Sequence, residues 1–188
     1  MQGTVRLETE RLILRQHVFE DAHILYTCFG RDPKMYEYSG WNPFETEEMA
    51  QKTVQHFIDS YNNPHFYGWA IEFQNQLIGT IGAYDYDQKE NSVEIGVSIA
   101  RSSWGKGFAS EALRRVLAYL TEDEGITTVT AWCAENNIGS KRAMEKAGMI
   151  QTSIDNDVLT VNKEIFRKLN FEYHAIDAVP INSHPQET

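Results

Sequence analysis

The sequence contains no long hydrophobic run and few cysteines. No apolar segment approaches the roughly 18 residues of a membrane span, and no secretory signal opens the chain. The two cysteines, Cys28 and Cys133, form no CxxC pair, and we interpret both as buried thiols rather than as a disulfide or a metal site. We therefore expect a cytoplasmic protein that has no membrane partner.

Metal-ligand spacing and an excess of positive charge are also missing. The six histidines are scattered without an HExxH or similar arrangement, so we expect no metal. A net charge of −10 argues against a nucleic-acid surface, and we expect no nucleic-acid partner. The acidic excess fits a cationic partner and, equally well, simple solubility.

The length and composition indicate a single globular domain. The 188 residues show no internal repeat, and 41% hydrophobic and 23% charged residues are ordinary proportions for a chain with a sizeable core. We expect one domain over residues 1–176. Residues 177–188, with two prolines and no apolar pattern, are expected to form a poorly ordered tail.

Hydrophobic periodicity predicts an α+β protein whose central, mostly antiparallel sheet of about seven strands carries helices on both faces. The predicted strands are 11–15, 66–73, 77–86, 92–99, 127–133, 149–153 (or 149–161) and 169–176. The predicted helices are 20–29, one that Thr46 caps, 109–120 and 138–147. Gly30 and Gly148 are expected to end the first and the last of these helices.

A glycine loop joins the 92–99 strand to the 109–120 helix. Gly105 and Gly107 bracket Lys106, and the helix directs unpaired N–H groups and the positive end of its dipole at whatever lies above the loop. Such a site binds anions, most naturally a phosphate or a pyrophosphate. The alternative is a helix start with a glycine loop and no ligand.

The spacing distinguishes this loop from two other phosphate-binding motifs. A P-loop has four residues between its glycines and then Lys-Ser/Thr, whereas one residue separates Gly105 from Gly107, and Phe108 follows. A dinucleotide fingerprint needs a third glycine where this chain has Ser110. Neither motif fits.

Two segments resemble the signatures of the GNAT N-acetyltransferases. Residues 104–109, Trp-Gly-Lys-Gly-Phe-Ala, resemble the family's acyl-coenzyme A loop, Arg/Gln-x-x-Gly-x-Gly/Ala, with Trp104 departing at the first position. Asn137-x-x-Ser140, followed by Glu-Lys-Ala-Gly-Met over 145–149, resembles the second signature. The similarity extends from about Leu7 to about Tyr173 and is closest to the branch of ribosomal-protein-alanine acetyltransferases.

The resemblance implies a splayed sheet and acetyl-coenzyme A as the acetyl donor. Coenzyme A would hydrogen-bond along the 92–99 strand like an added strand and place its pyrophosphate on the glycine loop. The implied cofactor-binding residues are Val97, Ser98, Ile99, Trp104, Gly105, Lys106, Gly107, Phe108, Ala109, Asn137 and Ser140.

Glu94 is the catalytic base that the resemblance implies. An alkyl ammonium must lose a proton before it attacks a thioester, and Glu94 stands in the Glu-Ile-Gly context in which the family often has a catalytic glutamate. Backbone N–H groups near Val97 and Ser98 would hold the thioester oxygen as negative charge develops on it. The alternative for Glu94 is a strand-end carboxylate that faces solvent.

The usual proton donor of the family, a Tyr seven residues after the motif Asn, is replaced by Met144. We name Ser140 as the substitute, because this position holds the coenzyme A sulfur in the resembling branch. Alternatively, Ser140 only satisfies backbone groups in the first turn of its helix. Two functions therefore remain open, an N-acetyltransferase and a coenzyme A-binding module that has lost catalysis and serves as a sensor or an interaction partner.

The acceptor amine is expected on the side of the sheet that the N-terminal segments cover. An irregular, aromatic stretch there, 36–44, offers Tyr36, Tyr38 and Trp41 as substrate-binding residues, since ring faces attract cations. Alternatively, these rings pack the loop onto the sheet. The sequence leaves open whether the acceptor is a protein N-terminus, a polyamine, an aminoglycoside-like antibiotic or a small metabolite, and whether the chain forms a homodimer.

Overall fold

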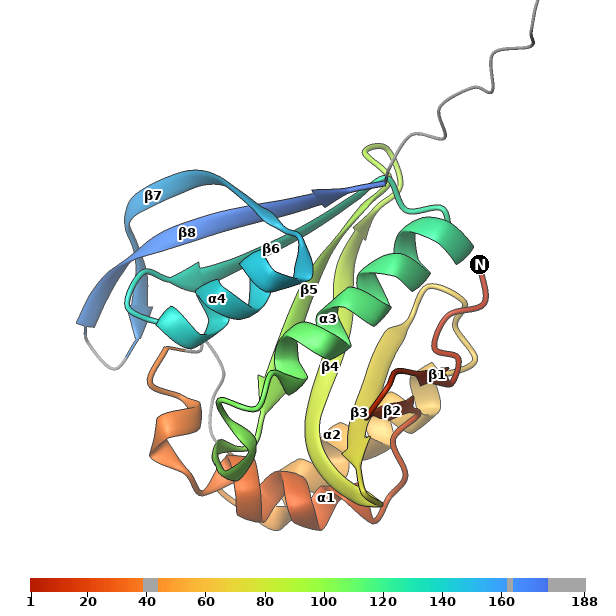
Figure 1. The fold of residues 1–188 in the computed structure, drawn as a ribbon. Coiled ribbons are helices and arrows are strands. Elements are labelled where there is room, and N and C mark those ends of the chain that lie inside the picture. The colour runs from red at the N-terminus through yellow and green to blue at the C-terminus, as the bar shows by residue number, and fades with distance from the viewer. Residues whose placement is uncertain (39–43, 162–163, 176–188) are drawn as a thin grey trace, which may run out of the picture.

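The computed structural model describes residues 1–38, 44–161 and 164–175, whose strands form a single sheet with the order β1-β2-β3-β4-β5-β6-β8-β7 (Figure 1). Neighbouring strands are antiparallel except β5 and β6, which are parallel. The strands are β1 (Leu7–Glu8), β2 (Ile13–Arg15), β3 (Tyr67–Phe73), β4 (Gln76–Asp87), β5 (Ser92–Ile99), β6 (Thr128–Ala134), β7 (Ile150–Val161) and β8 (Glu164–His174).

The main helices are those that periodicity predicts, with two of them extended by a π-helical turn. They are α1 (Asp21–Ile24) with η1 (Leu25–Gly30), α2 (Glu47–Ser60), α3 (Phe108–Ala118) with η4 (Tyr119–Asp123), and α4 (Ile138–Ala147). Short 3₁₀ turns, η2 (Pro33–Met35) and η3 (Arg101–Ser103), lie between larger elements. None of the helices in the described ranges is long and apolar enough to cross a membrane.

Helix ends confirm two of the predicted caps. Thr46 Oγ1 accepts a hydrogen bond from Met49 N (3.3 Å) at the start of α2, and Gly148, at φ +96°, ends α4 in the left-handed conformation. Gly30 also stands at a helix end, but it is not left-handed. A Cβ there would lie 2.8 Å from Phe44 Cβ, so close packing requires this glycine.

The structure confirms the predicted mostly antiparallel sheet of about seven strands. The described residues form eight strands, because two-residue β1 also pairs with β2 through Leu7 and Leu14. Cys28 is exposed, against the expectation that both cysteines are buried. Cys133 is buried as predicted, and this burial raises the pKa of its thiol to about 11. The expected tail at 177–188 lies outside the described residues.

The sheet has a helical layer on each face. On one face, α3 lies beside α4 (Figure 1) and buries Ala112, Leu113, Val116 and Leu117 against the strands. On the other face, α1 and α2 pack together in a smaller cluster. Since side chains alternate along a strand and Val93 and Ile95 belong to the α3 core, Glu94 between them points to the face of α1 and α2.

The two parallel strands pair only at their beginnings. Three residue pairs join β5 to β6, the last being Glu94 with Thr130. Beyond them β5 continues along β4 as far as Ile99, while β6 pairs with β8 over its whole length. The strands therefore diverge toward their carboxyl ends, as Figure 1 shows, and the predicted splay of the sheet lies between β5 and β6.

A buried carboxylate at the end of η4 connects that turn to the N-terminal segment and to β3. Glu124 accepts hydrogen bonds from Tyr67 Oη (2.6 Å), Tyr119 Oη (3.0 Å) and Gln2 N (2.8 Å). Burial by itself raises the pKa of Glu124, but these donors outweigh it and hold the pKa below its ordinary value. The carboxylate thus satisfies buried hydroxyl groups that would otherwise have no charged acceptor.

We expect Glu124→Gln to lower the free energy of unfolding at pH 7 by about 1–3 kcal/mol, because an amide supplies fewer acceptors to the buried hydroxyls. Urea unfolding measures the loss, and Glu122→Gln on the exposed surface of η4 is the control. A lowered pKa stabilises the fold above the ordinary value of 4.5, and this contribution disappears as the pH falls through the folded pKa. The difference between wild type and Glu124→Gln should therefore shrink in acid. Equal losses for both variants would contradict this role.

Candidate active site

The segment between β5 and α3 forms an open, left-handed turn. Gly105 has φ +75° and Gly107 has φ +81°, values that residues with a side chain rarely adopt. The first hydrogen bond of the helix runs from Glu111 N to Gly107 O (3.1 Å). The N–H groups of Phe108, Ala109 and Ser110 precede this bond, so they and the positive end of the helix dipole can face an anion above the loop.

Side chains hold the glycine loop in this shape. Trp104 Nε1 donates to Ile99 O (2.6 Å) and connects the loop to the end of β5. Lys106 Nζ donates to Ser102 O (3.0 Å), so the amine folds back on its own segment. The Trp that departs from the family pattern thus braces the loop, although 48% of its surface is exposed.

Arg11 clamps the loop from the N-terminal segment, a role that no pattern in the sequence indicates. Its Nη1 donates to Lys106 O (3.0 Å), its Nη2 lies 2.6 Å from Glu111 Oε2, and its guanidinium stacks 4.6 Å from the Phe108 ring centroid. Thr9 Oγ1 donates to Glu111 Oε1 (2.6 Å). Burial would raise the pKa of Glu111, but the hydrogen bonds from Thr9 and Arg11 lower that pKa overall. Glu111 therefore stays negatively charged opposite Arg11.

Glu94 lies where β5 and β6 begin to diverge. Trp132 Nε1 on β6 donates to Glu94 Oε1 (2.9 Å). Tyr84 stands opposite Glu94 on β4, and its hydroxyl lies over Gly96, 3.1 Å from where a Cβ would be. Burial and the adjacent Glu94 carboxylate raise the pKa of Tyr84 well above its ordinary value, so the phenol keeps its proton. Neither Tyr84 nor Trp132 was a candidate from the sequence.

The other predicted cofactor residues lie around the gap between the strands. Val97 and Ser98 lie beyond the last β5–β6 pair, and Ser98 pairs with Thr80 of β4. Asn137 Oδ1 accepts from Ser140 N (3.1 Å) and caps α4. Because β5 and β6 are parallel, the helices that follow them both begin at the carboxyl ends of the strands, so the loop at 104–109 and the Asn137 cap lie at the same end of the sheet.

The predicted substrate-binding aromatic residues of the N-terminal segment lie in different surroundings. Tyr38 packs edge-to-face on Phe166 of β8, with ring centroids 5.6 Å apart, and joins a cluster with Ala134 at the end of β6. Tyr36 instead donates its hydroxyl to Phe29 O and so contacts its own helical segment. Trp41 lies outside the described residues. Tyr38 therefore stands beside the divergent strands, whereas Tyr36 packs against η1.

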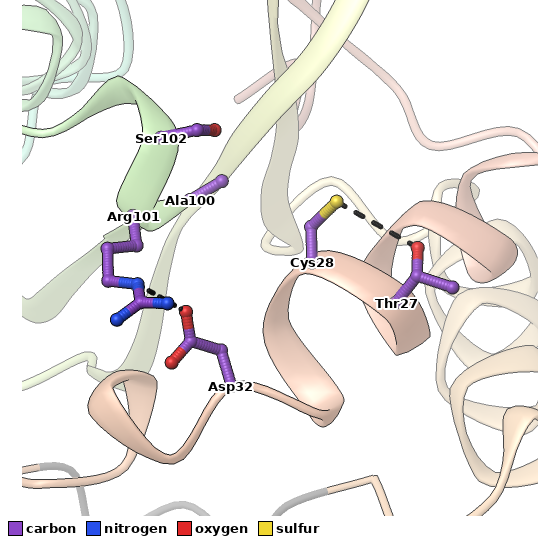
Figure 2. A pocket seen from close by; sticks show the side chains of 6 residues that line it. All are labelled: Thr27, Cys28, Asp32, Ala100, Arg101 and Ser102. Carbon is purple, nitrogen blue, oxygen red and sulfur yellow. Dashed lines mark hydrogen bonds and ion pairs between the residues drawn. The ribbon is translucent and has the colours of Figure 1, made fainter.

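A cavity of about 360 Å³ opens between η1 and the segment that leads into the loop (Figure 2). Asp32 Oδ2 and Arg101 Nε, 2.8 Å apart, span it on one side, and Cys28 and Thr27 line the other. Ala100 and Ser102 complete the lining. The cavity thus lies between the N-terminal segments and the end of β5, on the side from which the sequence predicts that an acceptor arrives.

Comparisons with known proteins agree with this geometry. A family model described as an acetyltransferase (GNAT) domain matches residues 11–150. The uncharacterized N-acetyltransferase YoaA of Bacillus subtilis is 36% identical over 144 residues, covering 76% of this chain and 81% of that protein. A GNAT-family acetyltransferase from Bacillus anthracis has a TM-score of 0.80 at 24% identity, covering 91% of this chain and 99% of the other. RimL, a ribosomal L7/L12 alpha-N-protein acetyltransferase in complex with coenzyme A, has a TM-score of 0.83 at 15% identity, covering 90% and 98%.

We expect Arg11→Met to lower the free energy of unfolding by about 1–2 kcal/mol, because it removes charged hydrogen bonds to Glu111 and Lys106 O while keeping an apolar stem. Amide exchange at residues 105–107 should also become faster. Arg6→Met is the matched control, since Arg6 pairs with Glu8 on the exposed surface and should change neither quantity much. If the loop amides exchange at the wild-type rate in Arg11→Met, Arg11 does not hold the loop.

Proposed function

The chain belongs to the GNAT family of acetyltransferases, and we propose that it moves the acetyl group of acetyl-coenzyme A onto a primary amine by direct attack within a ternary complex. The observation that carries this proposal is the placement of Glu94 at the point where β5 and β6 diverge, on the same connected segment as the glycine loop. Bound acetyl-coenzyme A supplies an activated thioester. The residues of this chain must hold it, admit the amine and remove a proton.

The glycine loop fits the pyrophosphate of coenzyme A. Of the residues that the structure describes, none lies within 4 Å of where a Cβ on Gly105 would be, and at Gly107 only Arg11 Nη2 approaches, at 3.5 Å. The backbone is therefore open to a bulky anion, and the first-turn N–H groups of α3 are available as donors. Asn137 would contribute by fixing the start of α4 beside the glycine loop, since the Asn137 side chain caps that helix.

Glu94 is the group that we assign as the base. Trp132 Nε1–H holds one carboxylate oxygen, which fixes the side chain and leaves further lone pairs to accept a proton from the incoming ammonium, directly or through a water. Backbone N–H groups near Val97 and Ser98, beyond the last pairing to β6, would donate to the thioester oxygen.

Ser140 remains our candidate for protonating the leaving thiolate. Its N–H is committed to Asn137, while its half-buried hydroxyl stands in the first turn of α4. Met144, which replaces the family's usual Tyr, is 5% exposed and packs in the core with α3. The packing of Met144 in the core accounts for an apolar residue at this position. The absence of the Tyr therefore does not favour the alternative of a coenzyme A-binding module without catalysis.

The acceptor would approach over the face that carries Glu94. Relatives include acetyltransferases of ribosomal proteins, so a protein N-terminus is one acceptor consistent with the proposal, along with small amines. Tyr38, packed beside the ends of β6 and β8, would then form part of the wall of the acceptor site.

We expect Gly107→Val to reduce the affinity for coenzyme A at least tenfold, about 1.4 kcal/mol, because a branched side chain obstructs the approach of the pyrophosphate. Calorimetry measures the affinity. Gly125→Val is the matched control, since Gly125 also has positive φ (+74°) and no neighbour within 4 Å of its Cβ position among the described residues, but lies in the turn after η4. Equal affinities in two folded variants would remove the loop from the binding site.

Glu94→Gln should lower kcat by roughly 10²–10⁴ while coenzyme A binding stays nearly constant, because the amide keeps the size of the side chain but cannot take the proton. Release of free thiol from acetyl-coenzyme A, measured below pH 8 with a panel of primary amines, gives the rate. Glu90→Gln, on the exposed turn before β5, serves as the control. A Glu94→Gln rate within twofold of wild type would show that another group is the base.

A further inference from the structure

A single aromatic ring separates the proposed base from a positively charged side chain. Trp132 donates its indole N–H to Glu94 (2.9 Å), and Lys168 Nζ of β8 lies over the same ring, 5.3 Å from its centroid. Glu94 and Lys168 therefore lie on the same face of the sheet, about one indole apart. We propose that Lys168 binds a carboxylate of the acceptor, so that this protein prefers amines that carry a carboxylate a few bonds from the reactive nitrogen.

The surroundings of Lys168 leave its charge available. Among the residues whose side chains the structure describes (1–38, 44–156 and 165–175), no carboxylate lies within ion-pair distance of Lys168 Nζ. Its cross-strand partner Asp155 instead accepts a hydrogen bond from Asn170 Nδ2 (2.8 Å). The preceding Arg167, by contrast, pairs with Glu135. The chain has 27 acidic and 17 basic residues, so acidic partners for a lysine are plentiful. Lys168 is half-buried and has no ion-pair partner among the described side chains, and balancing surface charge therefore does not explain its position.

The two charges match an acceptor that is itself dipolar. The ammonium of the acceptor is drawn to Glu94, and a carboxylate on the same molecule can reach Lys168 across the Trp132 ring. The overall charge of −10 repels anions at long range, so preference for such an acceptor depends on this local cation. Phe166 near the start of β8 and Tyr38, which packs edge-to-face on it, would bound the site on the side of β8.

This inference rests on the proposed function, because it takes Glu94 as the group that faces the amine. The chemistry has two sources, an acidic peptide N-terminus and a free amino acid. Matched probes distinguish them: the tetrapeptide amides Ser-Glu-Ala-Ala and Ser-Gln-Ala-Ala for peptides, and 4-aminobutanoate and 4-aminobutanamide for small molecules. Each pair differs only in whether a carboxylate is present near the amine.

The test compares kcat/KM for these probes in wild type, Lys168→Met, Lys168→Arg and Lys168→Glu. We expect Lys168→Met to lower kcat/KM at least tenfold for the carboxylate-bearing probe of the preferred pair and to change the amide probe less than twofold. Lys168→Arg should retain the preference, and Lys168→Glu should reverse it. Lys52→Met, whose lysine pairs with Glu48 on exposed α2, controls for removal of a positive charge.

Equal losses for both members of a pair would overturn the proposal, because they would mean that Lys168 only supports Trp132. An unchanged preference in Lys168→Met would overturn it as well. A second measurement does not depend on turnover: calorimetric binding of the same probes to the protein loaded with coenzyme A. If no probe is acetylated yet the carboxylate-bearing probe binds at least tenfold more tightly and loses this advantage in Lys168→Met, the carboxylate site stands and the proposed catalysis fails.

Discussion

The early separation of two parallel strands is the constraint on which the rest of the site depends. β5 stays paired with β4 to its end, and β6 stays paired with β8 along its whole length. The two strands share only three residue pairs before they separate. The inner edge of β5 beyond Glu94 then has no strand partner among the described residues, and in the proposed function coenzyme A would pair with it. In an antiparallel sheet with complete pairing, no such edge would exist.

The glycine loop at 104–109 depends on contacts that are remote in sequence. Its glycines permit the left-handed turn, but Arg11, about 95 residues earlier, connects Lys106 O to Glu111. Trp104 attaches the other side of the loop to the end of β5. The two N-terminal strands, β1 and β2, are short, yet they position the arginine that fixes the loop. Their contribution to function is therefore positional rather than chemical.

Four neighbouring strands contribute to one polar row on the face of the sheet that α1 and α2 cover. Tyr84 on β4, Glu94 on β5, Trp132 on β6 and Lys168 on β8 succeed one another across the sheet. The ring of Trp132 lies between the Glu94 carboxylate and the Lys168 ammonium and contacts both. In the proposals made above, this row would combine proton removal by Glu94 with recognition of a carboxylate by Lys168.

The sequence by itself determined the periodic elements and the glycine loop. The strand over 92–99 and the helix over 138–147 have the predicted bounds, because alternating and 3.6-residue patterns report directly which side of an element is buried. The same pattern cannot say which residue lies opposite across the sheet. The pairing of Tyr84 and Trp132 with Glu94, the Arg11 clamp and the exposure of Cys28 were decided by strand order and packing. Each joins segments that are distant in the chain, so only the tertiary structure could bring these residues together.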